Sequence, residues 1–576
     1  MDYIIHILIF ILIFAILVES LNLIMGYIGV ISMGHAVFSG LGAYTAALIS
    51  IHLGYNFLIG MIAGFILASI IGALLAIPSL RVKNEYLIVF TVGFQMIGYE
   101  VMLTARNITQ GAGGISNIPA PNLFGIWEFT TPLAYLPLVL FITAVCFAIV
   151  WRVTHSPFGR ILKAIREDET ACRALGKNSL QFKVIAFALG GGIAAIGGST
   201  LAYYISFISP LSFSVDVSVS LIVMVVLGGE ANFWAPLVGA TILVGLPEIL
   251  QFIPGAAGII DALREVLYGI ILIVFMCFRP QGILPEYSRR MGKVRIPAEF
   301  LGGNGGGDLY KEFSKPPAKE KSGHPILEVK GLNKAFGGLQ AVADVSFSLP
   351  AGQITGLIGP NGCGKTTIFN LITGHLIPDK GMVEIQGLDV TGQPPYKVVK
   401  SGLARSWQDV RIFHKMTVLN NVLAAFPNQR GENLALLFLQ PRRVAYEEIN
   451  NYRKAVEYIK LVGLLDKASQ LAGSLSTAEQ KLVALARLLA TECPVLLLDE
   501  PTASLDMESV ERIINLIRRI WKEGEKTILL VEHNLDVVRG LVEKAYFMSE
   551  GVILAYGKPS ELMEDPKLAE VYFGVS

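Results

Sequence analysis

A glycine-rich segment carries the first residues of this chain that could do chemistry. It reads GPNGCGKTT over residues 359–367 and directly follows the apolar stretch QITGLIG at 353–359. Backbone N–H groups of such a loop can surround phosphate oxygens at a helix N-terminus, where the helix dipole favours anions. The pattern predicts that the Lys365 ammonium neutralises the β- and γ-phosphates of a nucleotide and that the Thr366 hydroxyl reaches Mg²⁺. The candidate nucleotide-binding residues here are Gly359, Asn361, Gly362, Gly364, Lys365, Thr366 and Thr367.

Two carboxylates and a histidine follow two further apolar strands. A buried strand explains the apolar run of PVLLLDEP at 494–501, but it does not explain Asp499 and Glu500 at the end of that run. Asp499 suits coordination of Mg²⁺, directly or through water. Glu500 is placed to orient and polarise an attacking water, because phosphoryl transfer needs mainly positioning and charge stabilisation. TILLVEH at 527–533 ends in His533, which is either a surface histidine or a contact to the γ-phosphate.

The elements that must position these residues occupy the second half of the chain. Residues 325–576 alternate apolar strands with helical stretches, which predicts an α/β domain with a P-loop. The 576-residue chain as a whole is 53% hydrophobic and only 16% charged, whereas soluble proteins carry about 25% charged residues. Its net charge of +1 gives no reason to expect nucleic acid as a partner. The five cysteines form no CxxC pair, which indicates neither a disulfide framework nor a zinc site.

The first half predicts an all-α polytopic membrane bundle over residues 1–290. A spanning helix needs about 20 mostly apolar residues. The candidates lie near 3–24, 27–50, 56–79, 86–104, 132–151, 183–206, 216–253 and 262–279. GGEANFWAP at 228–236 should break the over-long stretch 216–253 into two short helices, giving about eight or nine in total. We expect the first stretch to be a retained membrane helix, because no basic residue precedes Arg81.

Basic residues predict the orientation of this bundle. Lys and Arg are concentrated in the connection 152–183, at Arg81 and Lys83, and after residue 278, which places these segments in the cytoplasm. The polar stretch 105–131 then falls on the opposite face. Within 152–177, the sequence SPFGRILKAIREDETACRALG has a charged amphipathic helix pattern. This pattern indicates either a solvated connection or a short helix that docks on a cytosolic partner.

Several polar residues lie in or beside the apolar stretches. Glu19, Glu100 and Glu248 are functional candidates by default, although each could instead lie at interface depth or cap a helix. His35, with Ser32, more readily makes a polar contact between packed helices than it binds a metal. The small residues at 26–44 and 188–202 predict close helix packing, or else unwound segments that line a pathway.

The boundary between the halves is predicted at 291–324. This stretch is rich in Gly, then in Pro and Lys, and cannot form a hydrophobic core, so it reads as a flexible linker between the membrane domain and the domain at 325–576.

The second half resembles the ATPases of ABC transporters. LSTAEQKLVALAR at 475–487 and SLD at 504–506 look like their signature and D-loop, and SWQDVRIF at 406–413 looks like their Q-loop. KAFGGLQAVADVSFSL at 334–349 is similar to the first strands of the branched-chain amino acid importer ATPase. The resemblance adds the nucleotide contacts Ser476, Asp506 and Phe336, the last an adenine-stacking aromatic or simply a packed strand residue. It also makes Gln408 a catalytic partner of Glu500 and His533 and, with Thr366 and Asp499, a metal ligand.

The membrane half resembles the permeases of the same systems at 21–48, 223–240 and 268–286. The resemblance implies a permease fused to an ATP-binding subunit in the cytoplasmic (inner) membrane, with 160–177 as the coupling helix region. It implies ATP and Mg²⁺ as cofactors. The implied partners are a second permease subunit, a second ATPase subunit, an extracytoplasmic solute-binding protein and membrane lipid, with no nucleic acid.

The implied function is ATP-driven import of branched-chain or other hydrophobic amino acids, with ATP hydrolysis coupled to transport. Relatives of this permease type also carry urea, short amides and other small carboxylic compounds, and a non-transporting ATP-gated membrane ATPase is a further alternative. An exporter is disfavoured, because fused exporters extend their helices far into the cytosol.

One departure from the family concerns the signature. Thr477, Ala478 and Glu479 stand where the family has Gly-Gly-Gln. Side chains at the first two positions narrow the approach to a phosphate, and Glu479 adds negative charge. We therefore expect ATP on this chain's P-loop to be hydrolysed against a partner's signature, and the reciprocal site to be weaker. Cys363 within the P-loop predicts sensitivity to thiol reagents, against which ATP should protect.

Overall fold

The computed structural model divides the chain into two units. It describes residues 2–79, 84–123, 127–250, 266, 269–271, 273–275, 277–279, 281–286, 325–524 and 526–573. One unit comprises Met1–Arg166 and Ser179–Met291, and the other comprises Glu167–Asn178 and Gly292–Ser576. Twelve residues that interrupt the first unit in sequence thus belong to the second. The predicted linker 291–324 lies outside the described residues.

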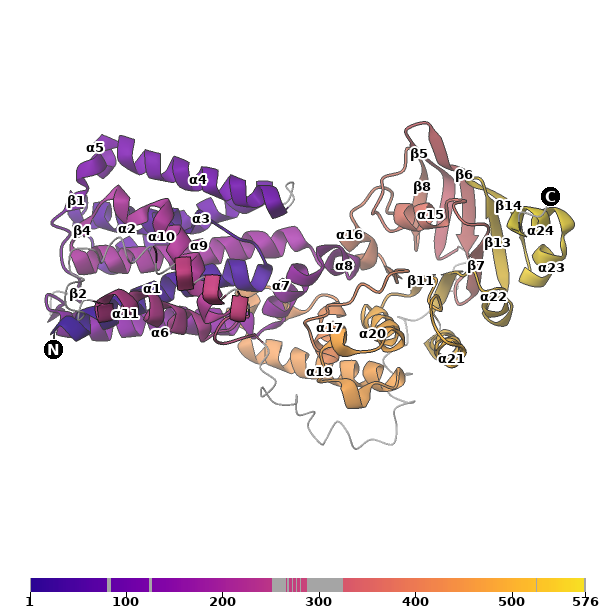
Figure 1. The fold of residues 1–576 in the computed structure, drawn as a ribbon. Helices are drawn as coiled ribbons and strands as arrows, with labels where there is room; N and C mark the ends of the chain where they lie inside the picture. Colours follow the sequence, from indigo (N-terminus) through magenta and orange to yellow (C-terminus); the bar gives the residue numbers. More distant parts are fainter. Residues whose placement is uncertain are drawn as a thin grey trace. The chain divides into compact units, whose positions relative to one another are not determined.

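The first unit is built of apolar helices (Figure 1). Its main elements are α1 (Asp2–Asn22), a π-helical turn (Leu23–Tyr27), α2 (His35–His52), α3 (Phe57–Ser79), α4 (Asn84–Thr104), α5 (Arg106–Thr109), α6 (Pro132–Thr154), α7 (Pro157–Glu167), α9 (Ser179–Ile205), α10 (Val215–Gly228) and α11 (Ala235–Leu250). Among the described residues, six helical segments are long and apolar enough to cross a membrane: Asp2–Tyr27, Phe57–Pro78, Tyr86–Thr104, Pro132–Thr154, Ser179–Ile205 and Pro210–Gly228.

The predicted break at 228–236 is present. Helix α10 ends at Gly228 and α11 begins at Ala235, with a turn between them. The predicted helix near 27–50 begins later, at His35, because the chain leaves helical geometry after Tyr27 and Gly29 adopts a positive φ of 80°. Most of the predicted span 262–279 lies outside the described residues, so the count of eight or nine helices stays a prediction.

The two ends of the helical unit differ. Strand β1 (Ile115–Ser116) pairs antiparallel with β4 (Phe207–Ile208), which joins the loop after α4 to the loop after α9. In Figure 1 these strands lie at the end that holds the N-terminus, and α7 lies at the opposite end. Helix α7, which carries part of the basic segment, and strand β1 of the polar stretch therefore lie at opposite ends of the helices, as the charge pattern predicts.

Small residues bring helices α2 and α9 into close contact. A Cβ at Gly198 would lie 1.9 Å from the carbonyl oxygen of Ser39, and a Cβ at Gly42 would lie 2.1 Å from that of Ala195. No side chain fits at either distance. In lipid, helix association depends on packing of this kind rather than on water exclusion.

Polar side chains tie helix α1 to its neighbours. The Ser20 hydroxyl lies 2.7 Å from Nε2 of His35, so the helix-packing contact predicted for His35 is made with Ser20. Asn22 accepts from the backbone N–H of Ala231 at 3.0 Å and donates to the carbonyl of Asn232 at 3.1 Å. The Tyr3 hydroxyl donates to the carboxylate of Glu248.

The second unit contains two sheets. One has the strand order β10-β11-β12-β7-β13-β14, with β14 antiparallel to β13 and the other neighbours parallel; the second is the antiparallel sheet β6-β5-β8-β9. The strands are β5 (Leu327–Phe336), β6 (Leu339–Leu349), β7 (Ile354–Ile358), β8 (Lys380–Ile385), β9 (Leu388–Asp389), β10 (Leu403–Arg405), β11 (Val495–Asp499), β12 (Thr527–Val531), β13 (Lys544–Ser549) and β14 (Val552–Gly557). All residues of β7, β11 and β12 are buried, as expected for parallel strands covered on both faces.

Helices surround these sheets, and one of them, α20, carries the signature. They are α8 (Glu169–Ala174), α15 (Lys365–Ile372), α16 (Pro395–Lys400), α17 (Val418–Ala425), α18 (Leu434–Leu439), α19 (Pro441–Leu461), α20 (Thr477–Ala490), α21 (Met507–Gly524), α22 (Leu535–Leu541), α23 (Pro559–Glu564) and α24 (Pro566–Phe573). The predicted amphipathic stretch is divided into α7 and α8, because the Asp168 side chain caps α8 by accepting from the backbone N–H of Ala171.

Candidate active site

The P-loop connects the buried strand β7 to helix α15. Gly364 has a φ of 108°, and a Cβ there would lie 2.4 Å from the carbonyl oxygen of Ala341, so only glycine fits this turn. The Lys365 ammonium donates to the carbonyl oxygens of Gly359 at 2.9 Å and Pro360 at 2.8 Å. Thr366 is exposed at the start of α15. The loop therefore presents a cation, a hydroxyl and a helix N-terminus together.

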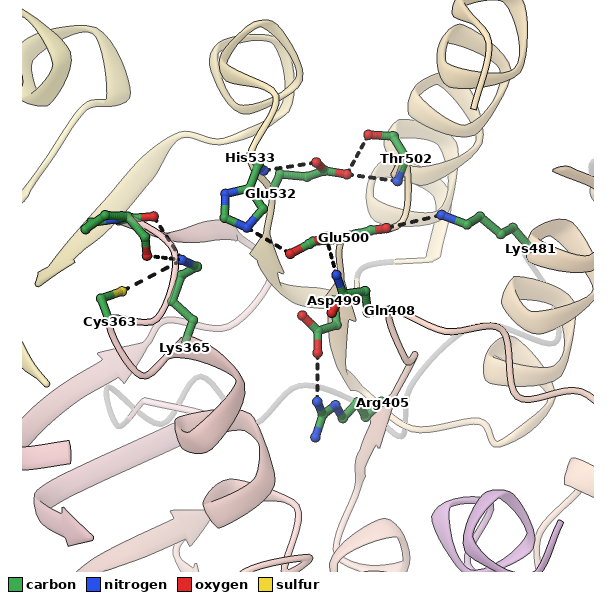
Figure 2. A network of polar contacts seen from close by, with 12 residues as sticks. Cys363, Lys365, Arg405, Gln408, Lys481, Asp499, Glu500, Thr502, Glu532 and His533 are labelled. Carbon is green, nitrogen blue, oxygen red and sulfur yellow. Dashed lines mark hydrogen bonds and ion pairs between the residues drawn. The ribbon is translucent and has the colours of Figure 1, made fainter. Parts of the chain in front are cut away.

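The three candidate catalytic residues meet at the end of β11 (Figure 2). The Gln408 side-chain amide donates to Oε2 of Glu500 at 2.8 Å, and Nε2 of His533 lies 2.8 Å from Oε1. Strands β11, β12 and β7 are neighbours in one parallel sheet, so their carboxyl ends bring Glu500, His533 and the P-loop to the same edge. Glu500 itself has a φ of 45°, and its N–H donates to the carbonyl of Val531.

Asp499 makes a buried ion pair that the sequence analysis missed. Its Oδ2 accepts from the Arg405 guanidinium at 2.7 Å, and both side chains are 2% exposed. Burial lowers the pKa of Arg405, and the neighbouring Asp499 opposes that shift. The guanidinium carbon also lies 4.4 Å from the Trp407 ring centroid. The signal was available, since Arg405 and Trp407 directly precede the Q-loop glutamine, but the register of β10 beside β11 was needed to connect them.

A second set of missed residues stabilises the turn after Glu500. Buried Glu532 accepts from the backbone N–H of Thr502 at 2.8 Å and from its hydroxyl at 2.6 Å. Lys481 of helix α20 donates to the carbonyls of Glu500 at 3.3 Å and Ala503 at 2.7 Å, and its burial lowers its pKa. Figure 2 shows the contacts of Glu532 with Thr502 and of Lys481 with Glu500 beside the catalytic group. They fix the backbone that carries Glu500 from two directions.

The signature lies at the N-terminus of α20 and is capped by its own side chains. Ser476 accepts from the backbone N–H of Glu479, and the Glu479 carboxylate accepts from the backbone N–H of Ser476, which forms a capping box. Glu479 also pairs with Lys467, and this hydrogen bond lowers the pKa of its carboxyl. The negative charge predicted at this position is therefore present but has a cationic neighbour.

The other predicted nucleotide contacts lie on exposed surface. Asp506 caps helix α21 by accepting from the backbone N–H of Ser509 at 3.2 Å and from its hydroxyl at 2.7 Å. Phe336 at the end of β5 is 46% exposed, with the Lys334 ammonium 5.9 Å from its ring centroid. An exposed aromatic at this place is available for stacking, so the prediction for Phe336 stands as a prediction.

The short segment Glu167–Asn178 contacts the Q-loop and the region after it. Asp168 pairs with Arg411 at 3.1 Å, and the Glu167 carboxylate accepts from the backbone N–H of Lys415 at 3.1 Å. Lys177, 3% exposed, donates to the carbonyl of Phe426 and pairs with Glu432. These contacts attach the predicted coupling segment directly to residues that follow Gln408 in sequence.

Comparison with known proteins agrees with this arrangement. Residues 3–276 match the family of branched-chain amino acid transport system permease components, and residues 342–503 match the ABC transporter family. The high-affinity branched-chain amino acid transport ATP-binding protein BraF of Pseudomonas aeruginosa is 35% identical over 252 residues, which are 43% of this chain and 98% of BraF. The ATP-binding protein LivG of Salmonella typhimurium is 34% identical over 250 residues, with the same two coverages.

Similarity to solved structures covers a similar share of the chain. The ADP conformation of MJ1267, an ATP-binding cassette of an ABC transporter, is 30% identical and covers 44% of this chain and 100% of its own, with a TM-score of 0.37.

The P-loop, the carboxylate pair and the matched helices define an ABC transporter with an ATP-hydrolysing cassette. This chain belongs to the branched-chain amino acid uptake family of ABC transporters, with a permease and an ATP-binding subunit fused in one polypeptide. It is a multi-pass protein of the cytoplasmic membrane that binds ATP and couples its hydrolysis to transport.

Proposed function

We propose that this chain drives uptake of branched-chain and other hydrophobic amino acids. The observation that carries the proposal is the joint match of both halves. The permease half matches the branched-chain amino acid permease family over 3–276, and the ATPase half is similar to LivG and BraF over almost their whole length. Both halves of this one chain resemble parts of branched-chain amino acid transport systems, and this favours branched-chain amino acids as the substrate.

The geometry supports a specific division of labour in ATP hydrolysis. Lys365 and the backbone N–H groups of the P-loop hold the β- and γ-phosphates, after the ammonium leaves its contacts with Gly359 and Pro360. Glu500 accepts a hydrogen bond from the attacking water and polarises it, while Gln408 and His533 fix the carboxylate from two sides. His533 also lies where it can contact the γ-phosphate.

The residues present fit a bound Mg²⁺. The Thr366 hydroxyl, the Gln408 side-chain carbonyl and Asp499 are hard oxygen donors of the kind this ion prefers. Gln408 uses its amide nitrogen on Glu500, which leaves its oxygen as an acceptor. Such an ion supplies charge neutralisation for the phosphates. Asp499 shares its charge with Arg405, so a role through bound water suits it as well as direct ligation.

The transporter needs partners for a complete cycle. ABC ATPases work in pairs, so a second ATPase subunit would complete the composite sites, and a second permease subunit would complete the pathway. Selection of substrate outside the membrane would fall to an extracytoplasmic solute-binding protein. Nucleotide binding then shifts the population between inward and outward access, and hydrolysis resets it.

Uptake of labelled leucine tests the proposal. Cells carrying the chain should accumulate leucine, cells carrying Lys365→Ala should not, and only aliphatic amino acids should compete. Competition by urea or short amides instead would move the substrate to those compounds. Leucine uptake that does not differ between chain and variant would contradict the proposed substrate.

A further inference from the structure

An exposed apolar segment of the ATPase domain has no role in nucleotide chemistry. Helix α18 has the sequence LALLFL and is followed by Gln-Pro-Arg-Arg. Phe438 is 46% and Leu439 79% exposed, and the following helix presents Tyr446 at 70%. Arg442 and Arg443 are exposed between them. We call Phe438, Leu439, Arg442, Arg443 and Tyr446 the α18 patch.

The patch is presented by a fixed element. The Asn433 side chain caps α18 by accepting from the backbone N–H groups of Ala435 and Leu436, and Leu437 is fully buried beneath it. Arg442 and Tyr446 are four residues apart on α19 and therefore face the same way. Leu437 thus anchors α18 to the domain, and the apolar and cationic side chains of the α18 patch face away from it.

Chain connectivity links this patch to the start of a membrane-spanning helix. Glu432, two residues before α18, pairs with Lys177. Lys177 is only two residues from Ser179, where the membrane-spanning helix α9 begins, and two residues reach at most about 7 Å. Helix α9 has 27 residues and is about 40 Å long, against a hydrocarbon core of about 30 Å, so its first turn lies at headgroup depth.

The chemistry of the patch fits that depth. Interfacial elements combine Phe, Tyr and Leu, which enter the boundary of the acyl region, with Arg, which meets lipid phosphates. Arginines near the cytoplasmic leaflet are attracted to its anionic lipids. Protein interfaces are also enriched in aromatic residues and arginine. The connection of the patch, through Glu432 and Lys177, to the start of a membrane-spanning helix favours lipid as the occupant.

We propose that the α18 patch rests on the anionic lipid surface of the cytoplasmic leaflet. The contact holds the ATPase domain against the membrane next to the segment through which it drives transport. The proposal depends on the membrane location of the chain and not on the identity of its substrate.

Site-specific fluorescence on the full-length protein tests this contact. A Leu439→Cys variant in a Cys277→Ser background is labelled with an environment-sensitive dye in the presence of ATP, which should protect Cys363, and is reconstituted into nanodiscs that contain phosphatidylglycerol. Leu388→Cys is the matched control, because Leu388 is an exposed leucine on β9 of the same domain. Quenching is measured with aqueous iodide and with lipids brominated near the headgroup.

The label at 439 should be protected from iodide and quenched by brominated lipid, and the label at 388 should show the reverse. Arg442→Gln and Arg443→Gln should each reduce the lipid-contacting population about fivefold. Iodide quenching at 439 equal to that at 388 would overturn the proposal. Protection at 439 from both quenchers would also overturn it and would assign the patch to a protein partner.

Discussion

The two halves of this chain use buried polar residues in different ways. In the ATPase half, polar side chains at strand ends converge on one another, as Gln408 and His533 do on Glu500. In the membrane half, the buried contacts of Ser20 with His35 and of Asn22 with the turn after α10 hold helices together. Chemistry on phosphate needs fixed residue types at fixed positions, whereas a transport pathway needs only packed helices that can rearrange. The sequence therefore identifies individual functional residues in the ATPase half and does not identify them in the membrane half.

The largest effect is expected when the Glu500 carboxylate at the end of β11 is removed. Glu500→Gln keeps the hydrogen bond from Gln408 geometrically possible but cannot polarise the attacking water. We expect ATP hydrolysis at this chain's P-loop to fall about 10²-fold or more, with nucleotide binding retained. Steady-state ATPase assays and nucleotide binding on the purified complex measure this, with exposed Glu508→Gln as the control. Hydrolysis close to that of the control would remove Glu500 from its assigned role.

The segment Glu167–Asn178 lies between two parts of the membrane half in sequence but belongs to the ATPase unit. Lys177→Met breaks the largely buried ion pair with Glu432, which costs up to about 3–5 kcal/mol. Uptake should therefore fall much more than ATP hydrolysis. Arg173→Gln is the control, because Arg173 pairs with Glu169 on exposed surface, where a pair contributes about 1 kcal/mol or less.

Adding Glu432→Gln to Lys177→Met should restore part of the uptake, because both charges of the ion pair are then removed together. If uptake and hydrolysis instead fall in parallel in both Lys177→Met and Arg173→Gln, Lys177 has no special part in coupling.

A third change acts on helix packing alone. Gly198→Leu places a side chain where a Cβ would lie 1.9 Å from the Ser39 carbonyl, so α2 and α9 must separate. Overpacking of this kind costs about 1–3 kcal/mol and should lower the thermal stability of the membrane half in detergent. Gly93→Leu is the control, since a Cβ at Gly93 meets no atom within 4 Å. Equal stability of both variants would show that the close contact is not required.

The smallest expected effect is at the signature. Thr477→Gly, Ala478→Gly and Glu479→Gln together restore the family pattern and remove one charge near the approaching phosphate. In a Lys365→Ala background, where only the reciprocal site can act, turnover should rise about fivefold, because a partly exposed charge with a cationic neighbour contributes about 1 kcal/mol. The control keeps the natural signature and inactivates each composite site separately. Equal turnover at the two sites would refute the prediction that the reciprocal site is weaker.

The sequence predicted the motif-bearing strands and missed the contacts between them. β7, β11 and β12 coincide with the predicted strands, because a buried parallel strand is a continuous apolar run and its boundaries are visible. Arg405 and Glu532 were missed because their partners, Asp499 and Thr502, become neighbours only through strand order and turn geometry. The start of α2 at His35 was missed because hydropathy does not change where the helix after Tyr27 is interrupted.

The most direct test of the account measures accumulation and phosphate release in the same proteoliposomes. The full complex is reconstituted with ATP inside and the solute-binding protein with labelled leucine outside. We predict leucine accumulation in proportion to phosphate released, with accumulation lost in Lys365→Ala and phosphate release reduced there to the turnover of the weaker reciprocal site. Accumulation that persists in Lys365→Ala, or phosphate release without accumulation in the unaltered chain, would contradict the claim that this ATPase half drives import through the permease half of the same polypeptide.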